Sequence, residues 1–137
     1  MSFSVRPSEY FYVNSRDESG AAYKVLSAFA DRGVNLLAFT AVPSGGDRAQ
    51  FALFPEDPSQ FAAEARLAKI EIEGPHYALL IQGDDALGRL AEVNELLFKA
   101  GVDVYASTGV SDGRGSFVYI VYVREDQFGR AVEALEL

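Results

Sequence analysis

Apolar and polar residues along the first half of the chain follow two kinds of spacing. The segment 20–32 carries apolar residues three or four positions apart, which predicts a helix with one apolar stripe. The members of this stripe are Ala22, Val25, Leu26 and Phe29. Other segments are rich in β-branched and aromatic residues and predict strands instead. These strands are expected at residues 9–14, 34–42, 48–54 and 70–74.

A second helix is predicted over residues 57–69, and its start is marked by three residues. Asp57 is a favourable N-cap, Pro58 suits the first helical position, and Gln60 stands where a capping box has its second member. A Gly-Pro pair after the strand that follows marks a boundary. The first half is therefore expected to run strand, helix, strand, strand, helix, strand.

The second half of the chain repeats this order at an offset of 68 residues. Gly33 and Gly101, which each end a predicted helix, are separated by this offset. Other matched pairs are Gly20 and Gly88, Val25 and Val93, Phe29 and Leu97, Val34 and Val102, and Gly45 and Gly113. Strands are predicted over 76–82, 102–110 and 116–123, and helices over 87–100 and from about residue 125. The repeated order predicts an internal duplication.

The duplication defines the expected fold class. Strand-helix-strand units with right-handed crossovers give a four-stranded antiparallel sheet with two helices on one face. We therefore expect an α+β protein in which a ferredoxin-like βαββαβ unit occurs twice in tandem, over residues 1–74 and 75–137. No strand is predicted after Leu135. The second module either stops one strand short or borrows that strand from the neighbourhood of the first.

Several predicted strands are apolar at nearly every position, namely 10–13, 77–81 and 117–123. A sheet with one wet face should alternate apolar and polar residues, and helices can cover only one face. The uncovered face is therefore expected to meet another sheet or subunit, which predicts a homodimer. The alternative is that tyrosine hydroxyls make this face tolerant of water. The tyrosines concerned are Tyr10, Tyr12, Tyr119 and Tyr122.

Composition narrows the function classes. The 137 residues are 49% hydrophobic and include no Cys and a single His, His76, which excludes disulfides, thiolate metal sites and a poly-His zinc site within one chain. Nucleic-acid binding needs a basic face for the phosphates, and the chain has a net charge of −8 and no Lys/Arg cluster, so we do not expect it to bind nucleic acid. No apolar run reaches the ~18–20 residues of a membrane-spanning helix, and no signal segment is evident. We expect a soluble cytoplasmic protein.

No catalytic constellation emerges from the sequence. A nucleophile needs a base and a group that orients the base. Ser107, Thr108 and Ser111 have no local His, and His76 has no partner in the sequence. The carboxylates are spread over predicted loops and helix surfaces. The sequence therefore predicts a protein without catalytic activity, metal or cofactor.

The ends of the first helix of each half carry the candidate binding chemistry. Gly20 and Gly88 stand where a strand passes into a helix, whose unpaired N–H groups and positive dipole end suit a carboxylate. Asn35 and Asp103 follow the other end of the same helices and could bind an ammonium group. Alternatively, both side chains only satisfy backbone groups of the turn. Asn94 replaces an apolar stripe position and is either a buried hydrogen-bonded group or part of a polar interface.

The paired motifs DESG…GVNL and DDALG…GVDV resemble those of ACT domains, small ferredoxin-like regulatory modules found on phosphoglycerate dehydrogenase, aspartate kinase and related amino-acid enzymes. The resemblance covers roughly residues 9 to 135. It implies that an effector, usually an amino acid, binds at the interface between paired modules. The implied ligand-binding positions are Asp17, Glu18, Ser19, Gly20, Asn35, Leu36, Asp85, Ala86, Leu87, Gly88, Asp103 and Val104. The proline of the family's Asp-x-Pro-Gly loop is replaced by serine in one loop and leucine in the other, so its φ is not preset.

These observations lead to one main functional hypothesis. The chain is expected to be a tandem ACT protein that binds a small molecule of the amino-acid class and acts as a non-catalytic regulator or sensor. One alternative is a ligand-free interaction module that docks a partner enzyme through its apolar sheet face. A small enzyme on the ferredoxin-like fold is a third hypothesis, because a fold does not fix a function.

Overall fold

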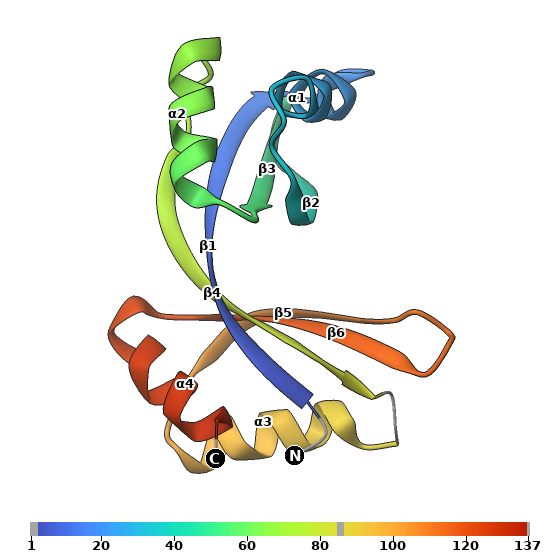
Figure 1. Ribbon diagram of the computed structural model, residues 1–137, viewed down its shortest axis with the longest axis vertical. Helices are drawn as coiled ribbons and strands as arrows, with labels where there is room; N and C mark the ends of the chain where they lie inside the picture. Colours follow the sequence, from blue (N-terminus) through green and yellow to red (C-terminus); the bar gives the residue numbers. More distant parts are fainter. Residues whose placement is uncertain (1–2, 85–86, 137) are drawn as a thin grey trace. The chain divides into compact units, whose positions relative to one another are not determined.

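The computed structural model describes residues 3–84 and 87–136 (Figure 1). Contacts between residues divide the chain into two compact units. The first unit is Glu9–His76. The second unit consists of the residues from Tyr77 onward together with the described residues before Glu9. Each unit is described by itself.

The first unit contains the elements of one ferredoxin-like βαββαβ module. Its elements are β1 (Phe3–Arg16) from Glu9 onward, α1 (Ala21–Ala30), β2 (Leu36–Gly45), β3 (Arg48–Pro55), α2 (Pro58–Ala68) and the beginning of β4 (Glu73–Asp84). The strand order is β2-β3-β1-β4, and β3 is antiparallel to both β1 and β2. Phe11 stands opposite Leu53, and Val13 stands opposite Phe51. This register brings the apolar residues of β1 and β3 to the same face of the sheet.

The second unit repeats this arrangement, but its fourth strand comes from the start of the chain. Its elements are the rest of β4, α3 (Arg89–Lys99), β5 (Val104–Ser111), β6 (Ser116–Val123), the 3₁₀ turn η1 (Glu125–Gln127) and α4 (Phe128–Leu135). The strand order is β5-β6-β4-β1, so the first residues of β1 take the place of the strand expected after Leu135. Ser4 Oγ donates a hydrogen bond to the Gln82 carbonyl oxygen at 3.4 Å.

Residues 3–8 of β1 supply the fourth strand of the second unit, so the sheet of this unit has four strands without an element after α4 among the described residues. The sequence repeat placed the start of the chain in the first module, over residues 1–74, and ended the second at 137. The contacts group Phe3 to Ser8 with the second unit instead. The division into modules over residues 1–74 and 75–137 stays a prediction. The fold class itself, a duplicated α+β ferredoxin-like fold with helices on one face of antiparallel strands, is confirmed.

Each unit has its own apolar core between its sheet and its helices. In the first unit, Phe29 of α1 and Phe61 of α2 stack with ring centroids 4.5 Å apart, and both are fully buried. In the second unit, Val93 and Leu97 of α3 are buried against β4 and β6 residues such as Leu79. Fully burying a side chain of this size stabilises the fold by roughly 1.5–3 kcal/mol. The predicted stripe of α1 therefore faces the core through Phe29, with Ala22 and Val25 packed against it, whereas Leu26 is not part of this core.

The four tyrosines of the water-tolerant alternative differ in their exposure to solvent. Tyr10 is 1% exposed and stacks on Phe54, with ring centroids 4.8 Å apart. Tyr119 belongs to the helix-side core of the second unit. For these two residues the water-tolerant alternative is wrong, because both rings are buried. Tyr12 and Tyr122 are half-buried. The predicted homodimer stays a prediction.

Local signals at the helix ends were predicted with one error. Asp57 is the N-cap of α2, and its carboxylate accepts a hydrogen bond from the Gln60 backbone N–H at 3.1 Å. The Gln60 side chain does not complete a capping box. Its Nε2 donates instead to the Gly33 carbonyl oxygen at 3.2 Å, which ties the start of α2 to the end of α1. In the ranges 3–84 and 87–136, no helix has the length and apolar character needed to cross a bilayer.

Candidate functional site

The helices α1 and α3 both begin without a side-chain cap. Gly20 and Gly88 are their N-cap residues, and both have φ 84°, in the left-handed region that glycine adopts most easily. A Cβ at either position would meet no atom within 4 Å, so the backbone conformation and not space calls for glycine. The Ala21 N–H donates to the Glu18 carbonyl oxygen at 3.2 Å, whereas the N–H groups of the next two residues of α1 and of the first three residues of α3 have no acceptor among the described residues, so these groups are open to a ligand or to water.

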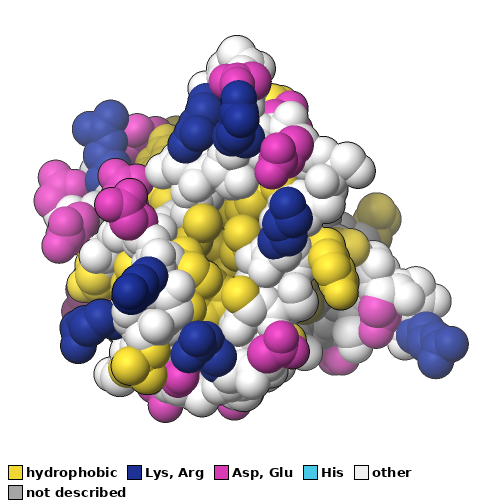
Figure 2. Space-filling model, turned by 90° about the horizontal axis from the view of Figure 1, so that it is seen from above, with side chains coloured by type: hydrophobic (Ala, Val, Ile, Leu, Met, Phe, Trp, Pro, Cys, Tyr) yellow, Lys and Arg dark blue, Asp and Glu magenta, His cyan; other side chains and the backbone are white. Residues whose placement is uncertain are grey.

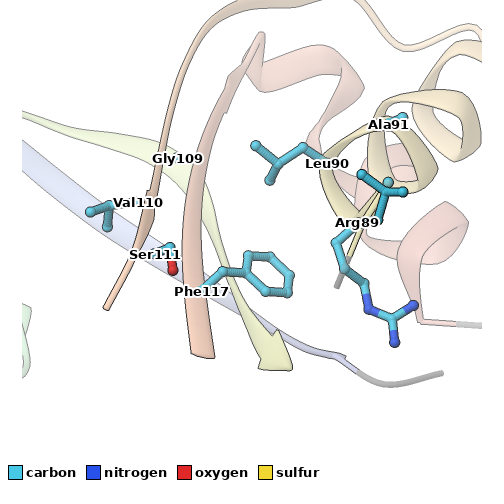
Figure 3. Close-up of a pocket in the computed structure, with 9 residues that line it drawn as sticks. Arg89, Leu90, Ala91, Gly109, Val110, Ser111 and Phe117 are labelled. Atoms are coloured by element: carbon cyan, nitrogen blue, oxygen red, sulfur yellow. The ribbon is translucent and has the colours of Figure 1, made fainter. Parts of the chain in front are cut away.

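A cleft lies beside each of these helix starts. The cleft of the second unit has a volume of about 420 Å³ and lies between the start of α3 and the strands β5 and β6 (Figure 3). It is lined by Leu87, Gly88, Arg89, Leu90, Ala91, Gly109, Val110, Ser111 and Phe117. The cleft of the first unit has a volume of about 300 Å³. It is lined by Asp17, Glu18, Gly20, Ala21, Ala22, Tyr23, Ala41, Val42, Pro43, Ala49 and Phe51.

The two clefts are copies of one another. Every residue that lines the second-unit cleft, except Leu87, has a counterpart 68 positions earlier that lines the first-unit cleft. The duplication that the glycine spacing predicts therefore includes a cleft at the start of the first helix of each unit. The sequence predicts the glycine side of these clefts but not the wall contributed by β2 and β5.

The walls of the two clefts contain different residue pairs at matched positions of the repeat. In the second unit, Leu90 extends from α3 toward the strand that carries Gly109 (Figure 3). A Cβ on Gly109 would lie 3.1 Å from a Leu90 methyl carbon, so the large residue needs the small one opposite. The counterparts in the first unit are Ala22 and Ala41. One large and one minimal side chain thus replace two small ones.

A polar network stands beside the second-unit cleft. Asn94 Nδ2 donates to the Tyr119 hydroxyl oxygen at 2.9 Å and to the Leu90 carbonyl oxygen at 2.8 Å. The Tyr119 hydroxyl donates to Ser107 Oγ at 3.0 Å. Asn94 is therefore an exposed, hydrogen-bonded residue, and the prediction that it is buried is wrong. The counterparts in the first unit are the apolar residues Leu26, Phe51 and Phe39.

The two clefts also differ in charge. Arg89 lines the second-unit cleft, donates from Nε to the Asp84 carbonyl oxygen at 3.3 Å, and pairs with Glu92 at 3.5 Å. The corresponding lining residue of the first-unit cleft is an alanine, and that cleft has Asp17 and Glu18 on its loop side. Figure 2 shows Lys, Arg, Asp and Glu side chains interspersed around apolar side chains.

The turn residues Asn35 and Asp103 do not line either cleft. Asn35 Nδ2 donates to a Glu56 carboxylate oxygen at 3.3 Å, and the Glu56 N–H donates to the Asn35 carbonyl oxygen at 2.9 Å. Asp103 lies 4.0 Å from the guanidinium of Arg124, which is the counterpart of Glu56. Asn35 therefore contacts Glu56 through an amide hydrogen bond, whereas the matched pair of the second unit, Asp103 and Arg124, forms an ion pair. These contacts join the start of β2 or β5 to the end of the adjacent strand.

The predicted binding positions fall into three groups. Asp17, Glu18, Gly20, Leu87 and Gly88 line the clefts. Ser19, Asn35, Leu36, Asp103 and Val104 do not line them. Asp85 and Ala86 lie outside the described residues. The cleft-lining Val42 and Val110 were missed, although exposed apolar residues at matched positions of the repeat are a signal that could have found them.

The second-unit cleft offers the more complete set of groups for a small anion-bearing ligand. Uncapped N–H groups and the Arg89 guanidinium can both donate to a carboxylate. Leu90 and Val110, which are 42% and 62% exposed, offer apolar contact. Within the described ranges, no group of three or more His, Asp or Glu side chains is arranged to hold a metal ion.

No protein-family model matches the sequence, and no curated protein does. Solved structures share its fold. Protein BT0572 from Bacteroides thetaiotaomicron is similar over 96% of this chain and 88% of its own, with 15% identity and a TM-score of 0.81. The regulatory subunit of aspartate kinase from Thermus thermophilus, in its ligand-free form, is similar over 98% and 94%, with 21% identity and a TM-score of 0.67. A structure of the aspartokinase α and β subunits has 14% identity and a TM-score of 0.67.

Proposed function

We propose that this chain is a non-catalytic regulatory protein that binds a small molecule of the amino-acid class. The observation that carries the proposal is the duplicated cleft beside a glycine-capped helix start. The clefts combine uncapped N–H groups with apolar walls, which are complementary to a carboxylate and an aliphatic side chain. The loop and turn positions outside the clefts, among them Asn35 and Asp103, are proposed to contact the ligand when modules pair.

The chemistry of the second-unit cleft supports a bound carboxylate. Arg89 and the N–H groups after Gly88 approach the same cleft from the start of α3. Both are hydrogen-bond donors, and both favour a negative charge. The first-unit cleft has acidic residues on its loop, so we expect it to bind an amino-acid carboxylate more weakly.

The likeness to regulatory subunits of aspartate kinase supports a regulatory role. These subunits share the fold of this chain over nearly their whole length. A regulator acts by binding one conformational or assembly state more tightly than another. We propose that the amino acid shifts this chain between free and self-associated or enzyme-bound states, and that the protein acts in the cytoplasm.

Ligand screening tests the proposal directly. Each of the twenty amino acids is added to the purified chain, and the unfolding temperature is measured. A ligand present at about 100 times its dissociation constant stabilises the folded state by about 2.7 kcal/mol. We expect at least one amino acid to raise the unfolding temperature and the others to have little effect.

A variant at Arg89 tests the position of the site. Arg89→Gln removes the guanidinium from the cleft, and Arg114→Gln removes one from the exposed β5–β6 turn as a matched control. Losing a charged hydrogen bond to the ligand costs about 1.5–3 kcal/mol, so calorimetric titration should give at least tenfold weaker binding for Arg89→Gln only. Equal affinity of both variants would rule out the second-unit cleft as the carboxylate site.

Exposed apolar side chains favour the alternative function, a ligand-free interaction module. Leu87 is fully exposed and lies beside Leu90 and Val110 at the rim of the second-unit cleft. Apolar surface of this kind is often covered by another protein. If no amino acid changes the unfolding temperature, the interaction module becomes the preferred function.

A further inference from the structure

A third cavity lies in the first unit, away from the helix starts. Its volume is about 400 Å³. Its lining residues are Tyr12, Asn14, Arg48, Glu71, Ile72 and Glu73. On β1, Phe11 and Val13 point into the helix-side core, so the alternating residues Tyr12 and Asn14 belong to the opposite face of the sheet. The cavity is therefore on the face that the helices of this unit do not cover.

Arg48 brings a positive charge without a carboxylate partner to this cavity. It stands directly opposite Arg16 in the register of β1 and β3. Like charges in this position repel each other. Arg16 pairs with Asp47 at 3.5 Å, whereas Arg48 makes no ion pair with any residue that the structure describes. An anionic group in the cavity would therefore be favoured beside Arg48.

Glu71 and Glu73 bring negative charge to the same cavity. The alternate residues Ile70 and Ile72 pack against the helix-side core, which leaves the two carboxylates for the opposite face. Neither carboxylate makes an ion pair within residues 3–84 and 87–136. A cationic group in the cavity would therefore be favoured beside them.

The two signs of charge stand on opposite sides of β1. Arg48 lies on β3, Glu73 begins β4, and β1 is the strand between them. Two inter-strand spacings of about 4.8 Å separate the backbones by roughly 10 Å. The opposite charges do not approach to ion-pair distance. A ligand that contacts both must carry its own charges several bonds apart.

This charge arrangement is not part of the duplicated scaffold. The counterparts of Tyr12, Asn14 and Arg48 in the second unit are Leu80, Gln82 and Ser116. None of these three counterparts is charged. The packing and strand pairing that both units share therefore do not require charged residues at these positions.

We propose that this cavity binds a small zwitterion whose carboxylate contacts Arg48 and whose ammonium group contacts Glu71 and Glu73. The charge separation favours an ω-amino carboxylate over an α-amino acid. Asn14 and Tyr12 at the centre of the cavity offer hydrogen-bonding groups to the chain between the two charges. This site is separate from the helix-start clefts and does not depend on their function.

A homologous series of ligands tests the proposal on the intact chain. Glycine, β-alanine, 4-aminobutyrate and 6-aminohexanoate are titrated while amide shifts are followed by nuclear magnetic resonance. We expect shifts at Asn14, Arg48 and residues 71–73, and an affinity that rises from glycine to one of the two longest members. Butyrate and butylamine, which each keep one charge, should bind about tenfold or more weakly than 4-aminobutyrate.

Two variants assign the charges. Arg48→Gln should weaken zwitterion binding about tenfold and leave butylamine binding unchanged, whereas Arg66→Gln on exposed α2 should change neither. The double variant Glu71→Gln, Glu73→Gln should weaken the zwitterion and leave butyrate binding unchanged. No shift with any member of the series in the unmodified chain, equal binding of glycine and the longest members, or unchanged zwitterion affinity in folded Arg48→Gln would overturn the proposal.

Discussion

Single residues at matched positions of the duplication compensate for one another. Leu90 and Gly109 stand where the first unit has Ala22 and Ala41, and the large side chain of Leu90 lies against a position that has no side chain. Such compensation is what close packing requires, because an added methyl group has no free volume to enter. The cleft wall is therefore a packed surface and not a loose one.

Substituting Gly109 tests this compensation. In Gly109→Ala the new Cβ would lie 3.1 Å from Leu90 and 3.2 Å from the Tyr119 ring. Leu90 is partly exposed and can turn away, but the buried ring is held by hydrogen bonds. We expect the free energy of unfolding, measured with urea, to fall by about 1 kcal/mol, the lower end of the overpacking range.

A second glycine provides the control for that measurement. Gly129 lies in α4 with nothing within 4 Å of a Cβ, so Gly129→Ala should stabilise the chain by up to about 1 kcal/mol. The double variant Leu90→Ala, Gly109→Ala reproduces the first-unit pair and should show a favourable coupling energy. Additive effects of the two substitutions would contradict the packing argument.

At the level of elements, the sequence predicts the helix starts, helix ends and apolar stripes, because these depend on residues that are close together in the sequence. The start of α2 at Asp57 and Pro58, and the glycine that ends α1, follow from local backbone chemistry. The helical stripes follow from the period of 3.6 residues. The side-chain target of Gln60 was predicted wrongly, because the Gly33 carbonyl competes with the capping box through a contact between two helices.

Elements that depend on distant residues were predicted only in part: a borrowed fourth strand in the second unit was one of two alternatives, and the residues that form it were not identified. The fourth strand of the second unit is contributed by residues 78 positions away, as the Ser4–Gln82 hydrogen bond shows, and no periodicity in the sequence reports such a pairing. The cleft walls are hidden for the same reason, since β5 becomes a wall only when it lies beside α3. Asn35 and Asp103 were chosen from their place after the helix ends and from a family resemblance, and their contacts within one unit are those of strand ends.

Removing the borrowed strand should affect the two units unequally. Phe3 and Val5 pack against the core of the second unit, so deleting residues 1–8 uncovers part of that core. We expect hydrogen exchange to accelerate in α3, α4 and β6, while amides of α1 and α2 keep more of their protection. Equal loss of protection in both units would show that the strand stabilises the whole chain and not the second unit in particular.

On the scale of the whole molecule, apolar surface and net charge act in opposite directions. A net charge of −8 opposes association between copies at low salt. The second unit nevertheless exposes Phe98, Tyr105 and Val110, the last two of them on β5, a strand at the edge of its sheet. Edge strands with apolar side chains readily pair with another chain. Salt concentration should therefore control how strongly copies associate.

We expect the chain to form a homodimer through such surface, and light scattering after size exclusion measures it. Raising the salt concentration from 0.01 to about 0.15 M shortens the screening length from about 30 to 8 Å and should increase the dimer fraction. Val110→Lys puts a charge on the β5 edge and should reduce it, whereas Lys99→Gln, in α3 and away from that edge, should not. A monomer at every salt concentration would contradict the expectation.

The strand β1 also has a consequence for how the protein is made. Its first residues belong to the second unit and its later residues to the first, so synthesis delivers one piece of the second unit before any of the first. On the ribosome, the first unit can complete its sheet while residues 3–8 still have no partner. These residues can pair only after β4 has emerged from the ribosome. Pairing across a separation such as the 78 positions between Ser4 and Gln82 is slow relative to local folding. A nascent chain stalled between the two units therefore carries an unpaired strand that could be captured by another copy.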